Sequence, residues 1–461
     1  MPSLFPSYIP YDPEEIYKPT FSKSEKWYNV DQAQSPHGGK LIERIIKNKD
    51  KATSLIKGLE RIPLDDSHAR EVVNIAYGIF SPLEGFMCKN DVDDVCKHLC
   101  LSNGYIWPIP IVFDVSTDAL RKLDLKGGDD ACLTHQGQPF AVFHIEEIFE
   151  YDKNMMAQHV YGTNDIKHPG VARTLNLNEL LVGGKIDLVN PPKINPPFNK
   201  YWYPPKKMRQ ELARRRWKTA IFFQTRNVPH IGHEFLMKTG SFYADGVVVN
   251  PVIGEKKMGD YIDELIVLTH DELSKKGYIR RDRHLVTIVF WDMRYAGPRE
   301  AVFHGLIRKN FGGTHHIYGR DHAGVGTYYH PYAAHAIFHY LPNLGFSPQL
   351  ILEYVYCPIC DEIAYEGLCG HEKHWQRFSG TLIRNIISEG STPSRKILRP
   401  EIFKAVMEGK KKYGTAFVTE EYLKNRIPLW TVQPLEDSDK KKGMKLDSLH
   451  WDKHGSLYSK Y

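Results

Sequence analysis

The fold is decided by the segment from Thr219 to His233, which reads TAIFFQTRNVPHIGH. Its apolar first half has the composition of a short buried strand, and its polar second half reads as a turn that enters a helix from Ile231. A strand that runs through a polar loop into a helix is the unit from which parallel sheets are built. Ligands bind such sheets beyond the carboxyl ends of the strands, so we expect the chemistry of this protein in the loop 224–233.

Short apolar runs and amphipathic stretches keep alternating through the middle of the chain. We expect further strands and helices there, with strands at 246–250, 285–290, 314–319 and 350–356 and helices at 261–274, from 298 onward and near 332–340. Short buried strands that alternate with helices are typical of a doubly wound parallel sheet. The sequence therefore predicts a central α/β domain, which we place at residues 196–378.

The two ends of the chain differ in pattern from the centre. In residues 1–195, Gly, Asp and Asn turn signals separate strand-like runs, which predicts a β-rich first domain with strands at 107–115, 139–145 and 185–189. The stretch 189–205 carries six prolines and is expected to be a linker. Residues 379–461 have a helical, charged pattern and end in a polar tail, which predicts a small α-rich third domain.

The composition is that of a globular protein and excludes several classes. Of the 461 residues, 42% are hydrophobic and 25% charged, unlike a disordered chain. No apolar run approaches the roughly 18–20 residues needed to span a bilayer, and the Pro-rich start lacks the layout of a signal peptide. We therefore expect a cytoplasmic protein without a membrane partner. The net charge of +6 suits an anionic ligand but is too small to indicate nucleic acid.

The loop after the first central strand is rich in hydrogen-bond donors and has no carboxylate. His230 and His233 are three residues apart, so they share one face at the start of a helix. Free backbone N–H groups and the helix dipole favour anions there. Together with Gln224, Arg226 and Asn227, the histidines indicate a site for a polyanion. The alternative, a polar turn with surface histidines, suits an isolated histidine pair better than this whole string.

Four further segments belong to the same predicted region. Glycines at both ends of Gly319–Gly324 (GRDHAG) allow close approach of the backbone to a ligand, and Arg320 adds a positive fork suited to an oxyanion. The other three segments are Met293–Ala301 (MRYAGPREA), Phe378–Arg384 (FSGTLIR) and Asn250–Asp260 (NPVIGEKKMGD). Each alone is compatible with a structural role, but together and in this order they are specific.

The loop QTRNVPHIGH is similar to the QxRNPxHxxH motif of ATP sulfurylases, and its HIGH tetrapeptide is shared with other α/β nucleotidyltransferases and class I tRNA synthetases. One departure is Pro229, which stands one place later than in the commonest form of the motif. GRDHAG, MRYAGPREA and FSGTLIR resemble further motifs of this family. The first domain resembles the family's PUA-like domain, at 36–39, 75–87, 107–115 and 161–171. The resemblance covers about residues 20–430, and without a GxxxxGK[ST] loop no fused adenylylsulfate kinase is expected.

The resemblance implies a sulfate adenylyltransferase. Sulfate would attack the α-phosphorus of ATP in line, and adenosine 5′-phosphosulfate and pyrophosphate would form reversibly without a covalent enzyme intermediate. Mg²⁺ is expected with the triphosphate. Family members commonly form homo-oligomers, so a homodimer is expected.

The resemblance also assigns roles to residues of the two loops. Sulfate would be held by Gln224, Arg226, Arg320 and the backbone N–H of Ala323. The ATP phosphates and the departing pyrophosphate would be bound by Asn227, His230 and His233, with Thr225 contributing at the α-phosphate. The predicted substrate-binding set also includes Asp321, His322 and Gly324.

A group of cysteines and histidines near 357–374 has the composition of a metal site. It comprises Cys357, Cys360, Cys369, His371 and His374. The first two cysteines have the spacing of a knuckle, and the third with one imidazole would complete a tetrahedral zinc site. Either histidine is available, and His374 is preferred because a four-residue loop closes more easily than a one-residue gap. A structural Zn²⁺ is expected because the group is separate from the phosphate loops; unliganded thiols are the alternative.

Three other functions remain open at this point. Another HIGH-type adenylyltransferase would share the first loop but not GRDHAG and MRYAGPREA. An RNA-binding protein with a PUA-like domain would carry an extended basic stripe with interleaved aromatics, which the sequence lacks. An inactive zinc-knuckle scaffold would not need intact phosphate loops.

Overall fold

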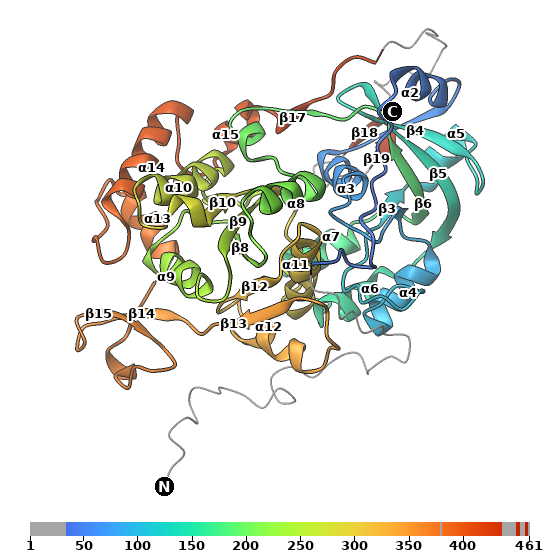
Figure 1. The fold of residues 1–461 in the computed structure, drawn as a ribbon. Coiled ribbons are helices and arrows are strands. Elements are labelled where there is room, and N and C mark those ends of the chain that lie inside the picture. Colours follow the sequence, from blue (N-terminus) through green and yellow to red (C-terminus); the bar gives the residue numbers. More distant parts are fainter. Residues whose placement is uncertain (1–33, 379, 436–448, 452–456, 460–461) are drawn as a thin grey trace.

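The computed structural model describes residues 34–378, 380–435, 449–451 and 457–459, so most of the polar tail expected at the C-terminus lies outside the described residues. Figure 1 shows an N-terminal domain in blue and cyan beside a central domain in green to orange, with C-terminal helices in red on the far side of the central domain. The predicted combination of a β-rich first domain, a parallel α/β domain and a helical C-terminal region is confirmed. Among the described residues, no helix is both long and apolar enough to cross a membrane.

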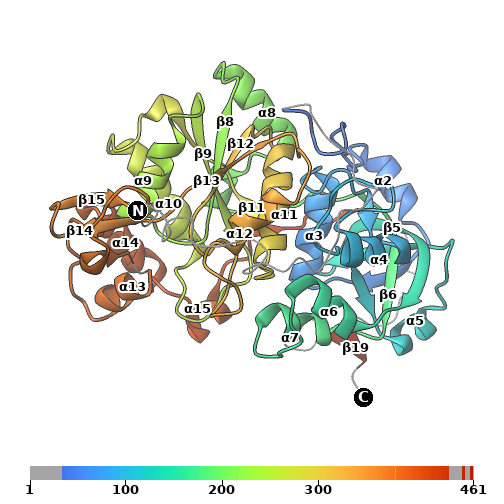
Figure 2. The same cartoon turned by 90° about the horizontal axis from the view of Figure 1, so that it is seen from below.

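Five parallel strands form the central sheet in the order β10-β9-β8-β12-β13. They are β8 (Ala220–Thr225), β9 (Gly246–Ile253), β10 (His284–Val286), β12 (His315–Tyr318) and β13 (Ser347–Leu350), and β11 (Val289–Phe290) adds to β9. Figures 1 and 2 show α9 (Ile231–Gly240) and α10 (Asp263–Lys275) on one face and α11 (Pro298–Asn310) on the other. From the adjacent strands β8 and β12 the chain proceeds in opposite directions, so the crevice beyond their carboxyl ends is the switch point where such sheets bind ligands.

The two innermost strands are apolar because helices cover both faces of the sheet. All of β9 is buried, and β8 is buried except for Gln224. The one polar side chain inside β9 is Asn250, whose Nδ2 donates to the carbonyl of Thr287 at 2.7 Å. The first polar side chain of β8 that is only partly buried is Gln224, near the carboxyl end of the strand.

Three expected elements of this domain are interrupted in the structure, two of them by hydrogen bonds to residues outside the sheet. The stretch 285–290 is divided because the N–H of Ile288 donates to the carbonyl of Tyr201, 3.1 Å away. The stretch 350–356 is divided between β13 and β14 (Tyr354–Cys357), because the N–H of Leu352 donates to the hydroxyl of Tyr365 at 3.2 Å. The helix near 332–340 is a short α12 (Ala333–Ala336) followed by the 3₁₀ turn η3 (Ile337–His339).

The N-terminal domain is built on a sheet in the order β1-β4-β5-β6-β2, with β3 also paired to β6. Its strands are β1 (Glu60–Pro63), β2 (Gly85–Phe86), β3 (Phe113–Val115), β4 (Asp130–His135), β5 (Gln138–Glu150) and β6 (Leu180–Leu188). Its helices are α2 (Lys49–Leu55), α3 (Asp66–Ala76), α4 (Lys89–His98), α5 (Thr117–Leu123), α6 (Lys153–Tyr161) and α7 (Pro169–Leu175). The expected strand 107–115 is reduced to β3, because Pro108 and Pro110 cannot donate to a ladder.

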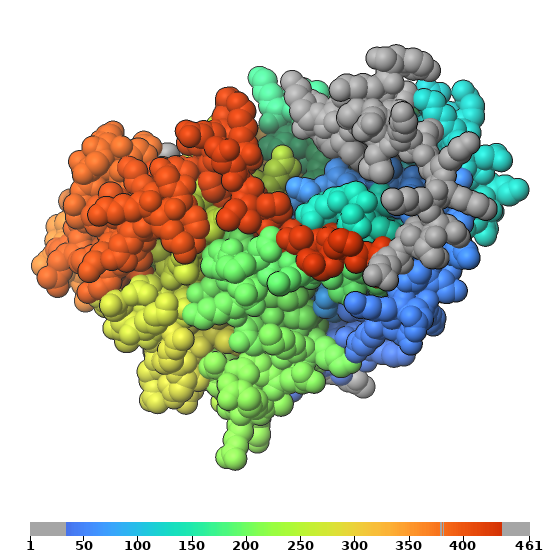
Figure 3. All heavy atoms as spheres, turned by 90° about the horizontal axis from the view of Figure 1, so that it is seen from above, coloured from blue at the N-terminus to red at the C-terminus, as the bar shows by residue number. Residues whose placement is uncertain are grey.

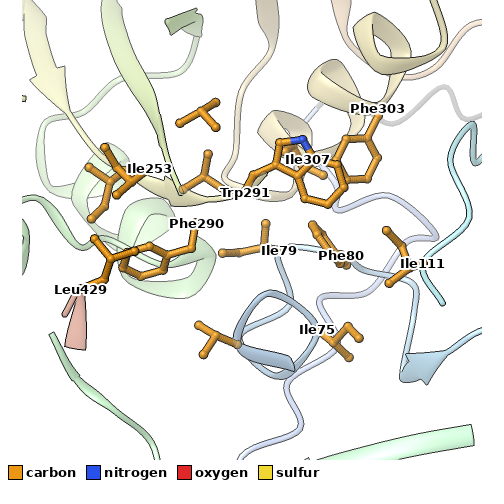
Figure 4. Close-up of a cluster of buried hydrophobic side chains, with 14 of the residues drawn as sticks. Ile75, Ile79, Phe80, Ile111, Ile253, Phe290, Trp291, Phe303, Ile307 and Leu429 are labelled. Atoms are coloured by element: carbon orange, nitrogen blue, oxygen red, sulfur yellow. The ribbon is translucent and has the colours of Figure 1, made fainter. Parts of the chain in front are cut away.

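The N-terminal and central domains share one hydrophobic core. Figure 4 shows Ile79 and Phe80 of the N-terminal domain pointing toward Trp291 and Phe303 of the central domain. The Phe80 ring centroid lies 5.7 Å from that of Trp291 and 5.4 Å from that of Phe303, both in edge-on arrangements. These side chains are 0–1% exposed. Because this interface is apolar and buried, we expect the N-terminal domain to keep a fixed position relative to the central domain.

The proline-rich stretch expected to be a linker is packed against the protein. It contains β7 (Lys193–Ile194) and η1 (Phe198–Tyr201), and it leads into α8 (Pro205–Arg214). Phe198 and Tyr201 are buried, and β7 pairs antiparallel with β17 (Trp430–Thr431). Figure 3 shows this late part of the chain, in red, lying across the surface between the C-terminal helices and the N-terminal domain. The proline-rich stretch is therefore paired with the C-terminal part of the chain and is not a free linker.

The C-terminal helices are α13 (Gly380–Ser388), α14 (Pro400–Tyr413) and α15 (Glu420–Asn425), and a hairpin of β18 (Leu449–Trp451) and β19 (Leu457–Ser459) follows them. Helix α14 packs closely on α10. A Cβ atom on Gly409 would lie 2.0 Å from Cδ2 of Leu265, so a larger residue at this position would have to displace the Leu265 side chain. The segment between α13 and α14 contacts the central domain as well, since the N–H of Ile231 in α9 donates to the carbonyl of Ile397 at 2.9 Å.

Candidate active site

The loop after β8 is shaped by its own polar side chains. Thr225 ends the strand, and its Oγ1 accepts the N–H of Asn227 at 3.1 Å, which turns the chain out of the sheet. His230 is the N-cap of α9, and its Nδ1 accepts the N–H of His233 at 3.3 Å. In return, Nδ1 of His233 lies 3.5 Å from the N–H of His230. The two histidines thus cap the helix as a reciprocal pair.

The same pair is held in its neutral form. Burial, followed by the neighbouring His233 and His270, lowers the pKa of His230 well below its usual value. Burial lowers the pKa of His233 to about 4. Since Nδ1 of each ring accepts a backbone N–H, the single proton of each neutral imidazole sits on Nε2. The N-terminus of α9 therefore carries two neutral N–H donors, the Nε2–H groups of His230 and His233.

The loop after β12 adopts a strained conformation. Asp321 and Ala323 have φ angles of 54° and 59°, in the left-handed region that non-glycine residues rarely adopt. Two backbone bonds hold it there, since Asp321 N–H donates to the carbonyl of Pro331 at 2.6 Å and Gly297 N–H donates to that of Ala323 at 3.1 Å. Next to them, Nε2 of His322 lies 3.0 Å from a ring nitrogen of His304. The conformation of the loop is thus held by hydrogen bonds within the protein itself.

A cavity of ≈ 310 Å³ lies between the two loops, at the switch point of the sheet. All residues predicted for the site line it, namely Gln224, Thr225, Arg226, Asn227, His230, His233, Arg320, Asp321, His322, Ala323 and Gly324. They come from two segments almost a hundred residues apart, joined by the pairing of β8 with β12. The volume is within the range of small-molecule sites.

The charged groups around this cavity favour an anion. Nη1 of Arg226 donates to the hydroxyl of Tyr295 at 2.7 Å, and Nε of Arg320 lies 3.8 Å from a carboxylate oxygen of Glu353. Burial raises the pKa of Asp321, against the lowering effect of the nearby arginines. The site therefore presents two guanidinium groups and neutral donors, with one of its acids disfavoured in the charged form.

Comparison with known proteins identifies the family. Residues 199–409 match the family model described as ATP-sulfurylase, and residues 34–191 match the one described as a PUA-like domain. A sulfate adenylyltransferase of Archaeoglobus fulgidus is 41% identical over 429 residues, which cover 84% of this chain and 94% of the relative. Another, from Cenarchaeum symbiosum, is 44% identical over 375 residues, covering 81% of this chain and 96% of the relative. The chain belongs to the ATP sulfurylase family.

A solved structure agrees with this fold. The hexameric APS kinase from Thiobacillus denitrificans superimposes with a TM-score of 0.63 at 19% identity, over 82% of this chain and 68% of that chain. At this identity the likeness shows the shared fold alone.

Several residues at the site were not among those predicted for it. Phe378 stacks on His230, with ring centroids 5.6 Å apart and planes 26° apart. Nη1 of Arg384 lies 3.5 Å from Oδ1 of Asn227. Phe378 and Arg384 belong to the FSGTLIR segment, so the family motif was their signal, although Ser379 of that motif lies outside the described residues. Glu353 also lines the cavity but sits in a strand-like run that gave no sign of it.

The MRYAGPREA segment mostly faces away from the cavity, which only Met293 of this segment lines. Arg294 pairs with Glu71 of the N-terminal domain, and both side chains are buried. Arg299 donates to the backbone carbonyls of Val95 at 2.9 Å and of neighbouring residues in the same domain. In this ATP sulfurylase family member, the motif therefore serves chiefly to join the domains.

The cysteine group forms a compact donor cluster with His371. The ligand atoms of Cys357, Cys360, Cys369 and His371 all lie within 4.8 Å of one another. The histidine that the structure places there is His371 rather than the preferred His374. The one-residue gap closes because the chain turns tightly after His371, whose carbonyl accepts the N–H of His374 at 2.9 Å and so leads His374 into the 3₁₀ turn η4 (Glu372–His374).

The donor set and its surroundings fit a structural metal. Three thiolates and one imidazole are a closed tetrahedral set of the kind that binds Zn²⁺. Nδ1 of His371 is 3.3 Å from Sγ of Cys360, and Trp375 Nε1 donates to Sγ of Cys369 at 3.2 Å. The cluster is framed by a small sheet of β14, β15 (Glu362–Tyr365) and β16 (Gln376–Arg377). Because β16 runs directly into Phe378, the cluster braces the segment that covers His230.

Proposed function

We propose that this protein is a sulfate adenylyltransferase that converts ATP and sulfate to adenosine 5′-phosphosulfate and pyrophosphate in a reversible reaction. The observation that carries the proposal is the meeting of Arg226, Arg320 and the neutral pair His230 and His233 in one cavity. Membership of the ATP sulfurylase family, with relatives of that activity matched over more than nine-tenths of their length, supports the same reaction.

The main obstacle to this reaction is repulsion between two anions. Sulfate is already deprotonated at neutral pH, so a general base would have no proton to remove. A sulfate oxygen forms the new bond to the α-phosphorus while the bond from that phosphorus to the bridging oxygen breaks, and pyrophosphate carries away the electron pair. The protein would contribute positioning and fixed positive potential, as in other phosphoryl-type transfers.

Sulfate would lie between the two loops, against Gln224, Arg226, Arg320 and the backbone N–H of Ala323. The fork of Arg226 matches the geometry of an oxyanion. The raised pKa of Asp321 supports this placement, because an acid that is disfavoured in its charged form repels a dianion less.

The triphosphate would lie along the N-terminus of α9. Asn227, His230 and His233 would bind its phosphates and the departing pyrophosphate, with Thr225 at the α-phosphate and with His322 and Gly324 on the opposite wall. Neutral Nε2–H donors at a helix N-terminus suit such a chain of oxygens. Mg²⁺ would be held chiefly by phosphate oxygens and water.

The remaining features follow from the same assignment. A structural Zn²⁺ would be held by Cys357, Cys360, Cys369 and His371, and when bound it would cross-link the loop that precedes Phe378. We further propose the division of the chain at 195/196 and 378/379, a homodimer, and a cytoplasmic location.

Acceptor specificity separates this function from its nearest rival. The protein should form ATP from adenosine 5′-phosphosulfate and pyrophosphate, and Arg320→Ala should weaken this while the exposed Arg280→Ala should not. Nicotinamide mononucleotide and tRNA should not serve as acceptors. Adenylyl transfer to either of these, without ATP formation from adenosine 5′-phosphosulfate, would assign the chain to another HIGH-type enzyme.

A further inference from the structure

Tyr295 connects the N-terminal domain to the cavity. It is 7% exposed, and its φ of 58° lies in the left-handed region, which is unfavourable for a bulky residue. Its carbonyl accepts a hydrogen bond from Nε2 of His168, 3.0 Å away in the N-terminal domain. The first domain therefore helps to set the direction in which the Tyr295 side chain leaves the main chain.

The side chain of Tyr295 meets Arg226 in two ways. Nη1 of Arg226 donates to the phenol oxygen at 2.7 Å, and the guanidinium carbon lies 5.0 Å from the ring centroid. Burial raises the pKa of this phenol to about 12, so the partner of Arg226 is neutral. Arg226 itself lines the cavity, whereas Tyr295 stands behind it.

An acidic residue competes for the same guanidinium group. Oδ2 of Asp260 is 3.9 Å from Nη1 of Arg226, which is the outer limit of an ion pair. A closer approach would neutralise the charge that an incoming dianion needs. Lys257 adds a second positive charge on the same tyrosine ring, with Nζ 4.0 Å from the centroid. The neutral ring of Tyr295 thus contacts Arg226 and Lys257 without neutralising the charge of either.

We propose that Tyr295 is the positioning residue of the sulfate subsite, and that its hydroxyl holds Arg226 toward the cavity and away from Asp260. The proposal rests on the proposed function, in which Arg226 binds sulfate. A hydrogen bond to a neutral partner orients the guanidinium group and leaves its full charge available. An ion pair with Asp260 would also orient this group, but it would neutralise the charge.

The test compares Tyr295→Phe, Asp260→Asn and the double variant. Loss of the hydroxyl should raise the KM for sulfate about tenfold, with the KM for ATP and kcat changed by less than about twofold. Asp260→Asn in the same chain should restore most of the affinity for sulfate, because it removes the competing partner. The control is Tyr356→Phe, which removes a phenol hydroxyl that donates to Asp361 outside the lining of the cavity, and it should change neither KM.

Each outcome decides the question. An unchanged KM for sulfate in Tyr295→Phe, an equal rise in both KM values, or no rescue by Asp260→Asn would overturn the proposal. If the wild-type protein shows no sulfate-dependent reaction, the proposed function fails. Positioning by Tyr295 is then judged by a crystal structure of Tyr295→Phe, in which Arg226 should have moved onto Asp260; a guanidinium group in its original place would refute it.

Discussion

The imidazole rings of His230 and His233 stack with their centroids 3.7 Å apart and their planes 18° apart. Each ring faces the backbone N–H of the other through Nδ1, so the pair caps α9 and cannot accept a proton at that nitrogen without breaking the cap. The arrangement explains how two adjacent histidines coexist at the positive end of a helix, where a charged imidazole would be repelled.

This pairing predicts the titration of both rings. The pKa of His233 is lowered to about 4 and that of His230 is lowered well below its usual value, so both should remain neutral, with the proton on Nε2, at pH 5.5. Long-range proton–nitrogen NMR on histidine-labelled protein would report protonation and tautomer, with His230→Asn and His233→Asn giving the assignments. Imidazolium signals that appear near pH 6.5 for these residues would contradict the pairing.

Replacement of His230 should separate its structural role from its functional one. Asparagine is a good N-cap, so His230→Asn should keep the thermal midpoint close to that of the wild type. It removes the Nε2–H donor, so kcat should fall by about 10²–10³-fold, the usual cost of losing a donor to the developing charge. His339→Asn, at an exposed histidine, is the matched control. An unfolded His230→Asn protein, or one with full activity, would count against this assignment.

The identity of the fourth metal ligand gives a further prediction. His371→Ala should lose Zn²⁺, measured as bound metal per chain after dialysis, and should melt at a lower temperature. His374→Ala should retain the metal, because the structure leaves His374 outside the donor cluster. Loss of the metal in His374→Ala and its retention in His371→Ala would instead support His374 as the fourth ligand, as loop length had suggested.

Much of the site was predictable because its signals are local. The strand, the loop and the capping histidines between Thr219 and His233 follow one another in the chain, so composition and spacing suffice to place them. The loop 319–324 is likewise read from its glycines and Arg320. These two segments alone supply every residue that was predicted to bind substrate.

What the sequence did not predict depends on contacts between distant segments. Glu353 reaches the cavity because the chain turns into the cysteine cluster just after β13. Arg294 and Glu71 form an ion pair although they are 223 residues apart in the sequence, and no local sequence pattern predicts such a pair. The preference for His374 failed because loop length was considered without the tight turn that follows His371 and leads into η4.

The buried ion pair of Arg294 and Glu71 between the domains gives a prediction about stability. Arg294→Met leaves the carboxylate of Glu71 buried without its partner and should lower the free energy of unfolding by about 3–5 kcal/mol. Replacing both groups, in Arg294→Met with Glu71→Leu, should cost markedly less, because no uncompensated charge remains. Urea unfolding of the three proteins measures the difference, and equal losses in the single and double variants would show that the ion pair is not the relevant contact.

The central claim is tested most directly by release of pyrophosphate from magnesium-ATP by the purified protein, with and without sulfate. We predict release that requires sulfate, or molybdate as an unstable substitute, that is abolished in Arg226→Ala and that persists in Arg280→Ala. Release that is independent of sulfate, or that survives the loss of Arg226, would contradict the account.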